Sequence, residues 1–180
     1  MKTKIDGVTV EIVEGDITKQ PDVEAVVNAA NAQLRTGGGV AGAIHRAAGP
    51  KLAEACRDFA PIKTGEAVIT DAFELDNDYV IHCLGPVYGV DRPEDQFLVK
   101  TYKNVLKTAE ENNIKSIAFP SISTGAFGYP IEQAAVTALR TIKSSLKDLQ
   151  SIEKIRFILF SSSDFKIYKD TMNSILKSED

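Results

Sequence analysis

Apolar and polar positions alternate along several short stretches of the chain and recur with helical spacing along others. Period-two alternation, or a short β-rich run between turn residues, predicts strands over residues 8–13, 25–28, 67–70, 79–84, 117–119 and 155–160. Helical spacing or an Ala-rich composition predicts helices over residues 40–48, 50–59, 97–109, 131–146 and 167–176. Because strands alternate with helices, the pattern predicts an α/β fold, a three-layer α/β/α sandwich around a mixed, largely parallel sheet.

No repeat, low-complexity segment or linker divides the chain, so residues 1–180 are expected to form a single domain. The composition, 43% hydrophobic and 26% charged, is typical of a globular protein with one core. Residues 116–131 are the longest uncharged stretch, but their Pro and Gly residues exclude a membrane helix. The N-terminal residues lack the apolar core of a secretion signal. We therefore expect a cytoplasmic monomer that does not enter a membrane.

The charge balance argues against nucleic acid as a partner. Lys and Arg number 21 and Asp and Glu 25, a net charge of -4, whereas nonspecific nucleic-acid binding needs a field of basic side chains. A small anionic ligand remains compatible, because backbone N–H groups and helix N-termini bind phosphates without net positive charge. Cys56 and Cys83 lack the spacing of a metal site, so both are expected to be reduced core thiols, and neither a metal nor a cofactor is expected.

Unusual polar and Gly-rich segments follow the predicted strands. In α/β folds, ligands bind outside the carboxyl ends of the strands, where loops lead into helix N-termini. The segments are residues 15–18, 27–31, 37–42 and 121–128. Two Gly-rich loops that feed two helices favour a diphosphate ligand. Residues 37–42 also match GxGxxG, but residues 32–36 separate them from the preceding strand, which argues against a dinucleotide-binding Rossmann enzyme.

Together these segments resemble the macrodomains, a family that binds ADP-ribose. The matching residues are GDIT at 15–18, VNAAN at 27–31, GGGVAGAIHRAAG at 37–49, VIHCLGP at 80–86 and PSISTGAFGYP at 120–130. Their order and spacing are similar to those of the family over nearly the whole chain, most of all to its bacterial branch that processes O-acetyl-ADP-ribose and mono-ADP-ribosylated proteins. The resemblance implies a macrodomain-like fold, ADP-ribose and mono-ADP-ribosylated proteins as partners, and metal-independent hydrolysis of ADP-ribosyl esters.

The resemblance also implies roles for individual residues. Asp16 would accept a hydrogen bond from the adenine amine, and the Ile17 N–H would face the ring. Phe160 would pack on adenine, with a plain core phenylalanine as the alternative. Asn31 would bind the distal ribose and orient it for catalysis. The residues expected to hold the diphosphate through backbone amides are Gly37, Gly38, Gly39 and Val40 on one side and Ser123, Thr124, Gly125, Ala126 and Phe127 on the other, with Phe127 also against the distal ribose.

Two positions depart from the family pattern. Ala41 stands where the most active bacterial relatives carry an aspartate that is thought to orient or activate the attacking water, and loss of a general base typically costs about 10²- to 10⁴-fold in rate. Coronavirus macrodomains, which the GGGVAG motif also resembles, hydrolyse the linkage without that carboxylate. We therefore expect a slow hydrolase, with a non-catalytic ADP-ribose reader as the alternative and RNA or poly(ADP-ribose) binding least favoured. Residues 161–164 replace an acidic run of close relatives, and Asp164 is expected to cap the last helix.

Three further polar residues have structural alternatives. His45 lies one helical turn after Ala41, where it either approaches the pocket mouth in a catalytic role or packs its helix. His82, inside an apolar strand, is expected in the core. Asn28 is expected to pin the loop that follows its strand rather than to bind a ligand.

Overall fold

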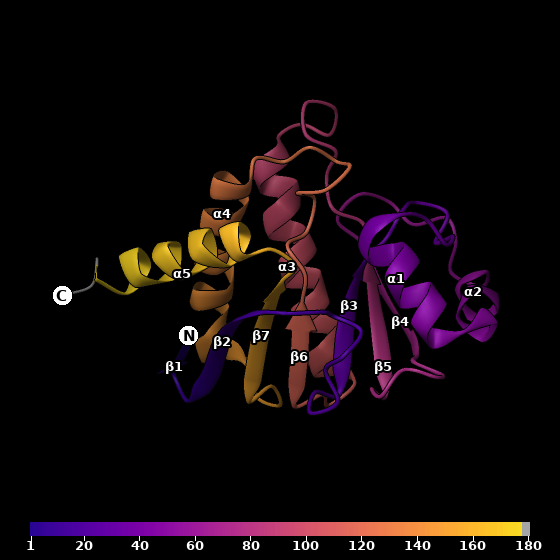
Figure 1. Ribbon diagram of the computed structural model, residues 1–180, viewed down its shortest axis with the longest axis horizontal. Coiled ribbons are helices and arrows are strands. Elements are labelled where there is room, and N and C mark those ends of the chain that lie inside the picture. The colour runs from indigo at the N-terminus through magenta and orange to yellow at the C-terminus, as the bar shows by residue number, and fades with distance from the viewer. Residues whose placement is uncertain (178–180) are drawn as a thin grey trace.

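A seven-stranded sheet forms the centre of the computed structural model, which describes residues 1–177 (Figure 1). Its strand order is β1-β2-β7-β6-β3-β5-β4. The strands are β1 (Lys2–Ile5), β2 (Val8–Glu14), β3 (Ala25–Ala29), β4 (Ala67–Asp71), β5 (Tyr79–Cys83), β6 (Ser116–Phe119) and β7 (Lys154–Leu159). The helices are α1 (Gly39–Ala48), α2 (Pro50–Cys56), α3 (Glu94–Glu111), α4 (Ile131–Ser145), the short 3-10 helix η1 (Leu146–Asp148) and α5 (Ser162–Lys177).

The five central strands run parallel, and each edge strand runs antiparallel to its neighbour. β2, β7, β6, β3 and β5 pair in parallel, whereas β1 pairs with β2 and β4 with β5 in the antiparallel sense. The register places Glu14 beside Leu159 and Ala29 beside Cys83, so paired strands end level with each other. The loops that follow therefore leave one edge of the sheet, where such folds bind ligands. The predicted mixed, largely parallel sheet is confirmed.

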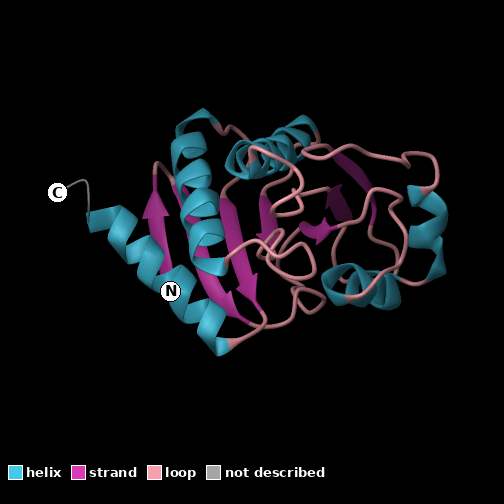
Figure 2. Ribbon diagram, turned by 90° about the horizontal axis from the view of Figure 1, so that it is seen from above, coloured by secondary structure: helices cyan, strands magenta, loops and turns pink. Residues whose placement is uncertain are grey.

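Helices cover both faces of the sheet, which confirms the predicted three-layer sandwich (Figure 2). On one face, α3, α4 and α5 pack over an aromatic cluster in which Phe119 and Phe157 stack with ring centroids 5.5 Å apart and Tyr102 and Tyr168 pack against Phe157. On the other face, α1 and α2 pack over the end of the sheet that holds β3, β5 and β4 (Figure 1). Beside them, residues 16–24 pack against β7 without forming a helix.

The strand β1 was not predicted, and several predicted elements have other bounds in the structure, among them α5, which begins at Ser162 rather than at residue 167. The strand β1 is not evident in the sequence, because its exposed Lys2 and Lys4 leave little apolar alternation. The helix α2 ends at Cys56 rather than Phe59, because the chain turns there and the Phe59 N–H donates to the Cys56 carbonyl (3.1 Å). None of the helices within residues 1–177 is both long and apolar enough to cross a bilayer.

The start of α5 corrects a further prediction. Asp164 lies in the first turn but does not cap the helix. Instead, Ser161 Oγ accepts a hydrogen bond from the Asp164 backbone N–H (3.2 Å), as an N-cap serine does. Because β7 ends at Leu159, Phe160 stands alone between the strand and this cap.

Candidate functional site

A cavity of about 340 Å³ opens at the carboxyl ends of β3, β5 and β6. One wall is the start of α1, and the opposite wall is the loop after β6. The residues that line it are Ala29, Ala30, Asn31, Gly37, Gly38, Gly39, Val40, Ala41, Gly85, Ser121, Ile122, Ser123, Gly125, Ala126 and Phe127. The structure thus brings all the predicted diphosphate residues except Thr124, together with Asn31, to one cavity.

The first turn of α1 is bare. Within residues 1–177, no side chain caps this helix at its N-cap residue Gly38, and its first turn carries no acidic residue. The first N–H groups of an α-helix have no partner inside the helix and carry the positive end of its dipole. Gly39 has φ +55°, and a Cβ on Gly38 or Gly39 would meet no protein atom within 4 Å. This turn suits an anionic group.

The loop after β6 is held at its base by two buried tyrosines. Tyr102 Oη accepts a hydrogen bond from the Ile122 backbone N–H (3.4 Å), and Tyr168 Oη lies 2.8 Å from Ser121 Oγ. Ser123 follows with φ +69°, a conformation that few non-glycine residues adopt. The aromatic core therefore fixes the base of this wall.

Gly85 forms a third side of the cavity and was missed by the sequence reasoning. A Cβ at Gly85 would lie well under 3.0 Å from the side chains of Ile122 and Ser123, so glycine lets the loops after β5 and β6 pack together. Ala29, Ala30, Ser121 and Ile122 were also missed as lining residues. All of these lie inside the motifs or just after predicted strands, where the carboxyl-end rule could have found them.

Asn31 lies in the cavity wall with its carboxamide already oriented. Nδ2 donates to the Arg35 carbonyl (2.8 Å), and Oδ1 accepts from the Arg35 N–H (3.0 Å). A carboxamide has a second hydrogen and further lone pairs for a ligand. Asn28, by contrast, is buried in β3, and its Nδ2 donates to His82 Nδ1 (3.0 Å). Asn28 is therefore structural, but it ties β3 to β5 rather than pinning the loop.

Asp16 follows β2 in a turn that fixes one carboxylate oxygen. Oδ1 accepts hydrogen bonds from the Thr18 hydroxyl (2.7 Å) and the Thr18 backbone N–H (2.9 Å). The hydroxyl contact, and then the N–H contact, lower the pKa of Asp16 from its ordinary value, so this group is an ionised acceptor at neutral pH. The side chain of Ile17 is buried in the core under α1.

Phe160 is 88% exposed, which excludes the core alternative. It follows β7, the neighbour of β2, and the Gly15 N–H donates to the Leu159 carbonyl (2.9 Å) beside it. Asp16 and Phe160 therefore follow adjacent strand ends. Neither they nor Ile17 lines the cavity, so the three residues predicted to bind adenine form a separate part of the same sheet edge.

Both histidines are buried away from the cavity. His82 is fully buried, with Nε2 3.0 Å from Thr70 Oγ1, and burial, with a smaller effect of His45, lowers the pKa of His82 to about 3. His45 is 5% exposed, its ring centroid lies 6.4 Å from that of His82, and burial lowers its pKa as well. The core position of His82 is confirmed. His45 does not reach the cavity mouth, and its packing alternative is the one that fits.

The cavity has no side chain that could act as a base. Among the described residues that line it there is no carboxylate, imidazole, amine or thiol, and Ala41, which is 6% exposed, has only a methyl group. Cys56 and Cys83 are free thiols buried elsewhere, and burial raises the pKa of Cys56 to about 11 and of Cys83 to about 12. Within residues 1–177, no three His, Cys, Asp or Glu side chains are grouped to hold a metal ion.

The family of this fold follows from a sequence match. The Macro domain model matches residues 27–138. The chain belongs to the Macro domain family. This macrodomain is 49% identical to Macro domain-containing protein CT2219 of Chlorobaculum tepidum, over 93% of this chain and 97% of that protein. It is 47% identical to the O-acetyl-ADP-ribose deacetylase of Klebsiella pneumoniae, over 91% of this chain and 96% of that protein. It is 48% identical to human ADP-ribose glycohydrolase MACROD2 over 95% of this chain, which corresponds to 41% of MACROD2.

Solved structures agree with the sequence match. The Oceanobacillus iheyensis macrodomain with ADP has a TM-score of 0.94 and 40% identity, over 99% of this chain and 97% of that one. The Trypanosoma brucei macrodomain in complex with ADP-ribose has a TM-score of 0.83 and 36% identity, over 89% of this chain and 68% of that one. The predicted family and the macrodomain fold are both confirmed.

Proposed function

We propose that this macrodomain binds ADP-ribose and slowly hydrolyses ADP-ribosyl esters, either mono-ADP-ribose on protein carboxylates or O-acetyl-ADP-ribose. The observation that carries the proposal is the cavity between the bare first turn of α1 and the loop after β6. The similarity of the chain to an O-acetyl-ADP-ribose deacetylase and to the ADP-ribose glycohydrolase MACROD2 supports the proposed reaction. Similar macrodomain structures that hold ADP or ADP-ribose support the proposed ligand.

The proposed ligand position follows from the geometry of the sheet edge. The diphosphate lies in the cavity between residues 37–40 and 123–127, whose backbone N–H groups hold it. Adenine lies beyond the ends of β2 and β7, with its amine at Asp16, its edge at the Ile17 N–H and its face on Phe160. The distal ribose lies at Asn31 and Phe127.

The chemistry proposed for this site is positioning and electrostatic stabilisation. An oriented Asn31 carboxamide holds the distal ribose, and the two walls place the diphosphate so that a water can approach the ester. Because no lining side chain can accept a proton, the macrodomain contributes no general base, and the rate is expected to be low.

Multiple-turnover release of ADP-ribose from an Asp/Glu-linked mono-ADP-ribosylated protein tests this proposal, with the macrodomain far below the substrate concentration. We expect many turnovers per molecule and a sharp loss of turnover in Asn31→Ala. Asn112→Ala, an exposed asparagine at the end of α3, is the matched control. Unchanged turnover in Asn31→Ala would refute the role of Asn31. Calorimetry with ADP-ribose accompanies the assay, and absence of binding would overturn the proposal as a whole.

The alternative function, an ADP-ribose reader, is favoured by one observation, the methyl group of Ala41 at the start of α1. Binding without release would establish the reader. Ala41→Asp then separates the two functions, because a large gain in rate at unchanged affinity would show that the natural chain lacks the base that catalysis needs.

A further inference from the structure

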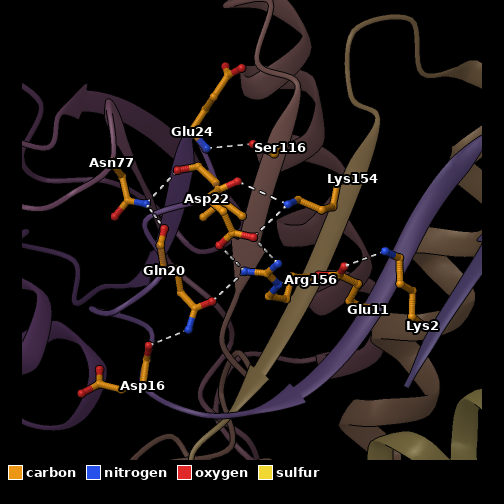
Figure 3. Close-up of polar contacts among 11 residues, drawn as sticks. Lys2, Glu11, Asp16, Gln20, Asp22, Glu24, Asn77, Ser116, Lys154 and Arg156 are labelled. Atoms are coloured by element: carbon orange, nitrogen blue, oxygen red, sulfur yellow. Dashed lines mark hydrogen bonds and ion pairs between the residues drawn. The ribbon is translucent and has the colours of Figure 1, made fainter.

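A partly buried polar network holds residues 16–24 on the sheet (Figure 3). It lies on the same face as α1 and α2, on the part of that face that the two helices do not cover. Arg156 of β7 stands beside Glu11 of β2 in the register, and its Nε donates to Glu11 Oε2. Its Nη2 donates to Asp22 Oδ2 (2.6 Å) in residues 16–24, the segment that crosses from β2 to β3. The side chains of Arg156 and Glu11 are each 11% exposed, so this is a shielded ion pair rather than a surface one. It ties the crossing segment to two strands.

Gln20 connects this network to the turn at Asp16. Its Nε2 donates to the Asp16 carbonyl (2.9 Å), and its Oε1 accepts from Arg156 Nη1 (2.8 Å). A guanidinium can only donate, so Arg156 selects the oxygen end of the carboxamide and leaves the NH₂ end for Asp16. The residue is 8% exposed, and Asn77 Nδ2 donates to its backbone carbonyl (2.7 Å). Gln20 is therefore held at its backbone and at both ends of its side chain (Figure 3).

The Asp16 carbonyl belongs to the same planar peptide unit as the Ile17 N–H. In a trans peptide the N–H points opposite to the C=O, so a hydrogen bond that fixes the carbonyl also fixes the direction of the N–H. The same bond restrains the Cα that carries the Asp16 carboxylate. We infer that Gln20, oriented by Arg156, is a positioning residue that sets the specificity of this macrodomain for adenine. The inference rests on the proposed function, in which adenine meets Asp16 and Ile17.

The ratio of the affinities for adenine and hypoxanthine distinguishes a positioning role of Gln20 from a merely structural one. Adenine presents an amine donor and an adjacent ring nitrogen acceptor, which match a carboxylate and an N–H. Hypoxanthine presents an oxygen acceptor and an N–H donor at the same two positions, so it mismatches both groups. Loss of stability would weaken binding of both bases alike, whereas a misdirected turn weakens the binding of adenine alone.

Gln20→Met removes the link without leaving a partner unsatisfied. The Asp16 carbonyl still accepts from the Lys19 N–H (3.0 Å), and Arg156 Nη1 still donates to Asp22 Oδ1 (2.8 Å). Methionine has a similar length, so the variant is expected to fold. Gln20→Glu is the second variant, because it can still accept from Arg156 but cannot donate to the Asp16 carbonyl when ionised. Lys154→Met is the matched control, since it breaks another contact to Asp22 and leaves Gln20 untouched.

Calorimetry with ADP-ribose and with inosine diphosphate ribose measures the preference for adenine. We expect Gln20→Met and Gln20→Glu to reduce this preference about three- to tenfold, the factor that corresponds to one neutral hydrogen bond, and Lys154→Met to leave it unchanged. An unchanged preference in both Gln20 variants, or no preference in the wild type, would overturn the inference alone. If the wild type binds neither compound, the proposed function fails and the inference fails with it.

Discussion

Gly42→Ala should strongly weaken ADP-ribose binding, although alanine is the better helix former. Gly42 lies in the interior of α1, and a Cβ there would fall well under 3.0 Å from the backbone carbonyl oxygen of Gly37, in the wall of the cavity. The Arg46 guanidinium, at 2.9 Å, is the end of a flexible side chain and can move aside. The Gly37 carbonyl has no such freedom, so its loop must withdraw by about 1 Å to restore an ordinary contact in a close-packed structure.

The effects on stability and on binding should separate. Replacing glycine by alanine inside a helix gains about 1 kcal/mol, and overpacking costs about 1–3 kcal/mol, so the free energy of unfolding should fall by about 2 kcal/mol or less. Withdrawal of the Gly37 loop removes a charge-assisted hydrogen bond to the diphosphate, which weakens binding by roughly 10- to 100-fold.

Calorimetry with ADP-ribose and urea unfolding measure the two effects. Arg46→Ala is the control and should bind normally, whereas Gly42→Ala with Arg46→Ala should bind as weakly as Gly42→Ala, because the Gly37 contact persists. Binding by Gly42→Ala within twofold of the wild type would refute the argument that this glycine sets the cavity wall.

Three other perturbations test separate parts of the molecule. Phe160→Ala should leave the melting temperature unchanged, because the exposed ring packs against nothing in the core. It should weaken ADP-ribose binding roughly 5- to 100-fold in calorimetry, because the stacking of adenine on the ring is lost. Equal affinity would contradict the proposed adenine position. His82 binds protons less readily in the folded state, with a pKa of about 3 against 6.5, so stability should fall as the pH drops below 6.5. Urea unfolding should show a loss of about 2–3 kcal/mol between pH 7 and 4.5 from this group, and His82→Gln should abolish that loss; an unchanged loss in the variant would contradict the role of His82. The rate of ADP-ribose release should show no decrease on acidification with an apparent pKa between about 5 and 8, because no lining side chain titrates; such a limb would reveal a base that the cavity lacks.

Local patterns predicted most elements because each one carries its own periodicity. The helix α3 has a full apolar stripe, and the parallel strands are short apolar runs between turns, so both could be recognised without knowledge of the fold. The strand β1 could not, because Lys2 and Lys4 point to solvent at the sheet edge and its pairing with β2 is what makes it a strand. Its stability comes from the neighbour rather than from its own sequence.

The residues of the candidate site likewise divide into those that local sequence patterns could predict and those that they could not. Residues 37–40 and 123–127 could be placed together in advance, because loops after parallel strands meet at one edge of a sheet. The position of Gly85 follows from the same rule, but its need for glycine could not be predicted, because the side chains that approach it belong to a loop much later in the chain. Gln20 is a stronger case, because its partner Arg156 is separated from it by most of the sequence, and no local pattern reports such a contact.

The absence of a carboxylate at position 41 should affect ADP-ribose binding as well as catalysis. Ala41 lies in the first turn of α1, where N–H groups without intrahelical partners carry the positive end of the helix dipole. An aspartate there would be stabilised by the same N–H groups that are proposed to hold the diphosphate, so the ligand and the side chain would share one source of positive potential. With alanine, that potential is left to the ligand. Alanine at this position therefore removes a proton acceptor and leaves the helix N–H groups free to bind the diphosphate. Both effects favour slow hydrolysis with tight product binding, so a slow hydrolase and a reader differ only in how far the rate has fallen.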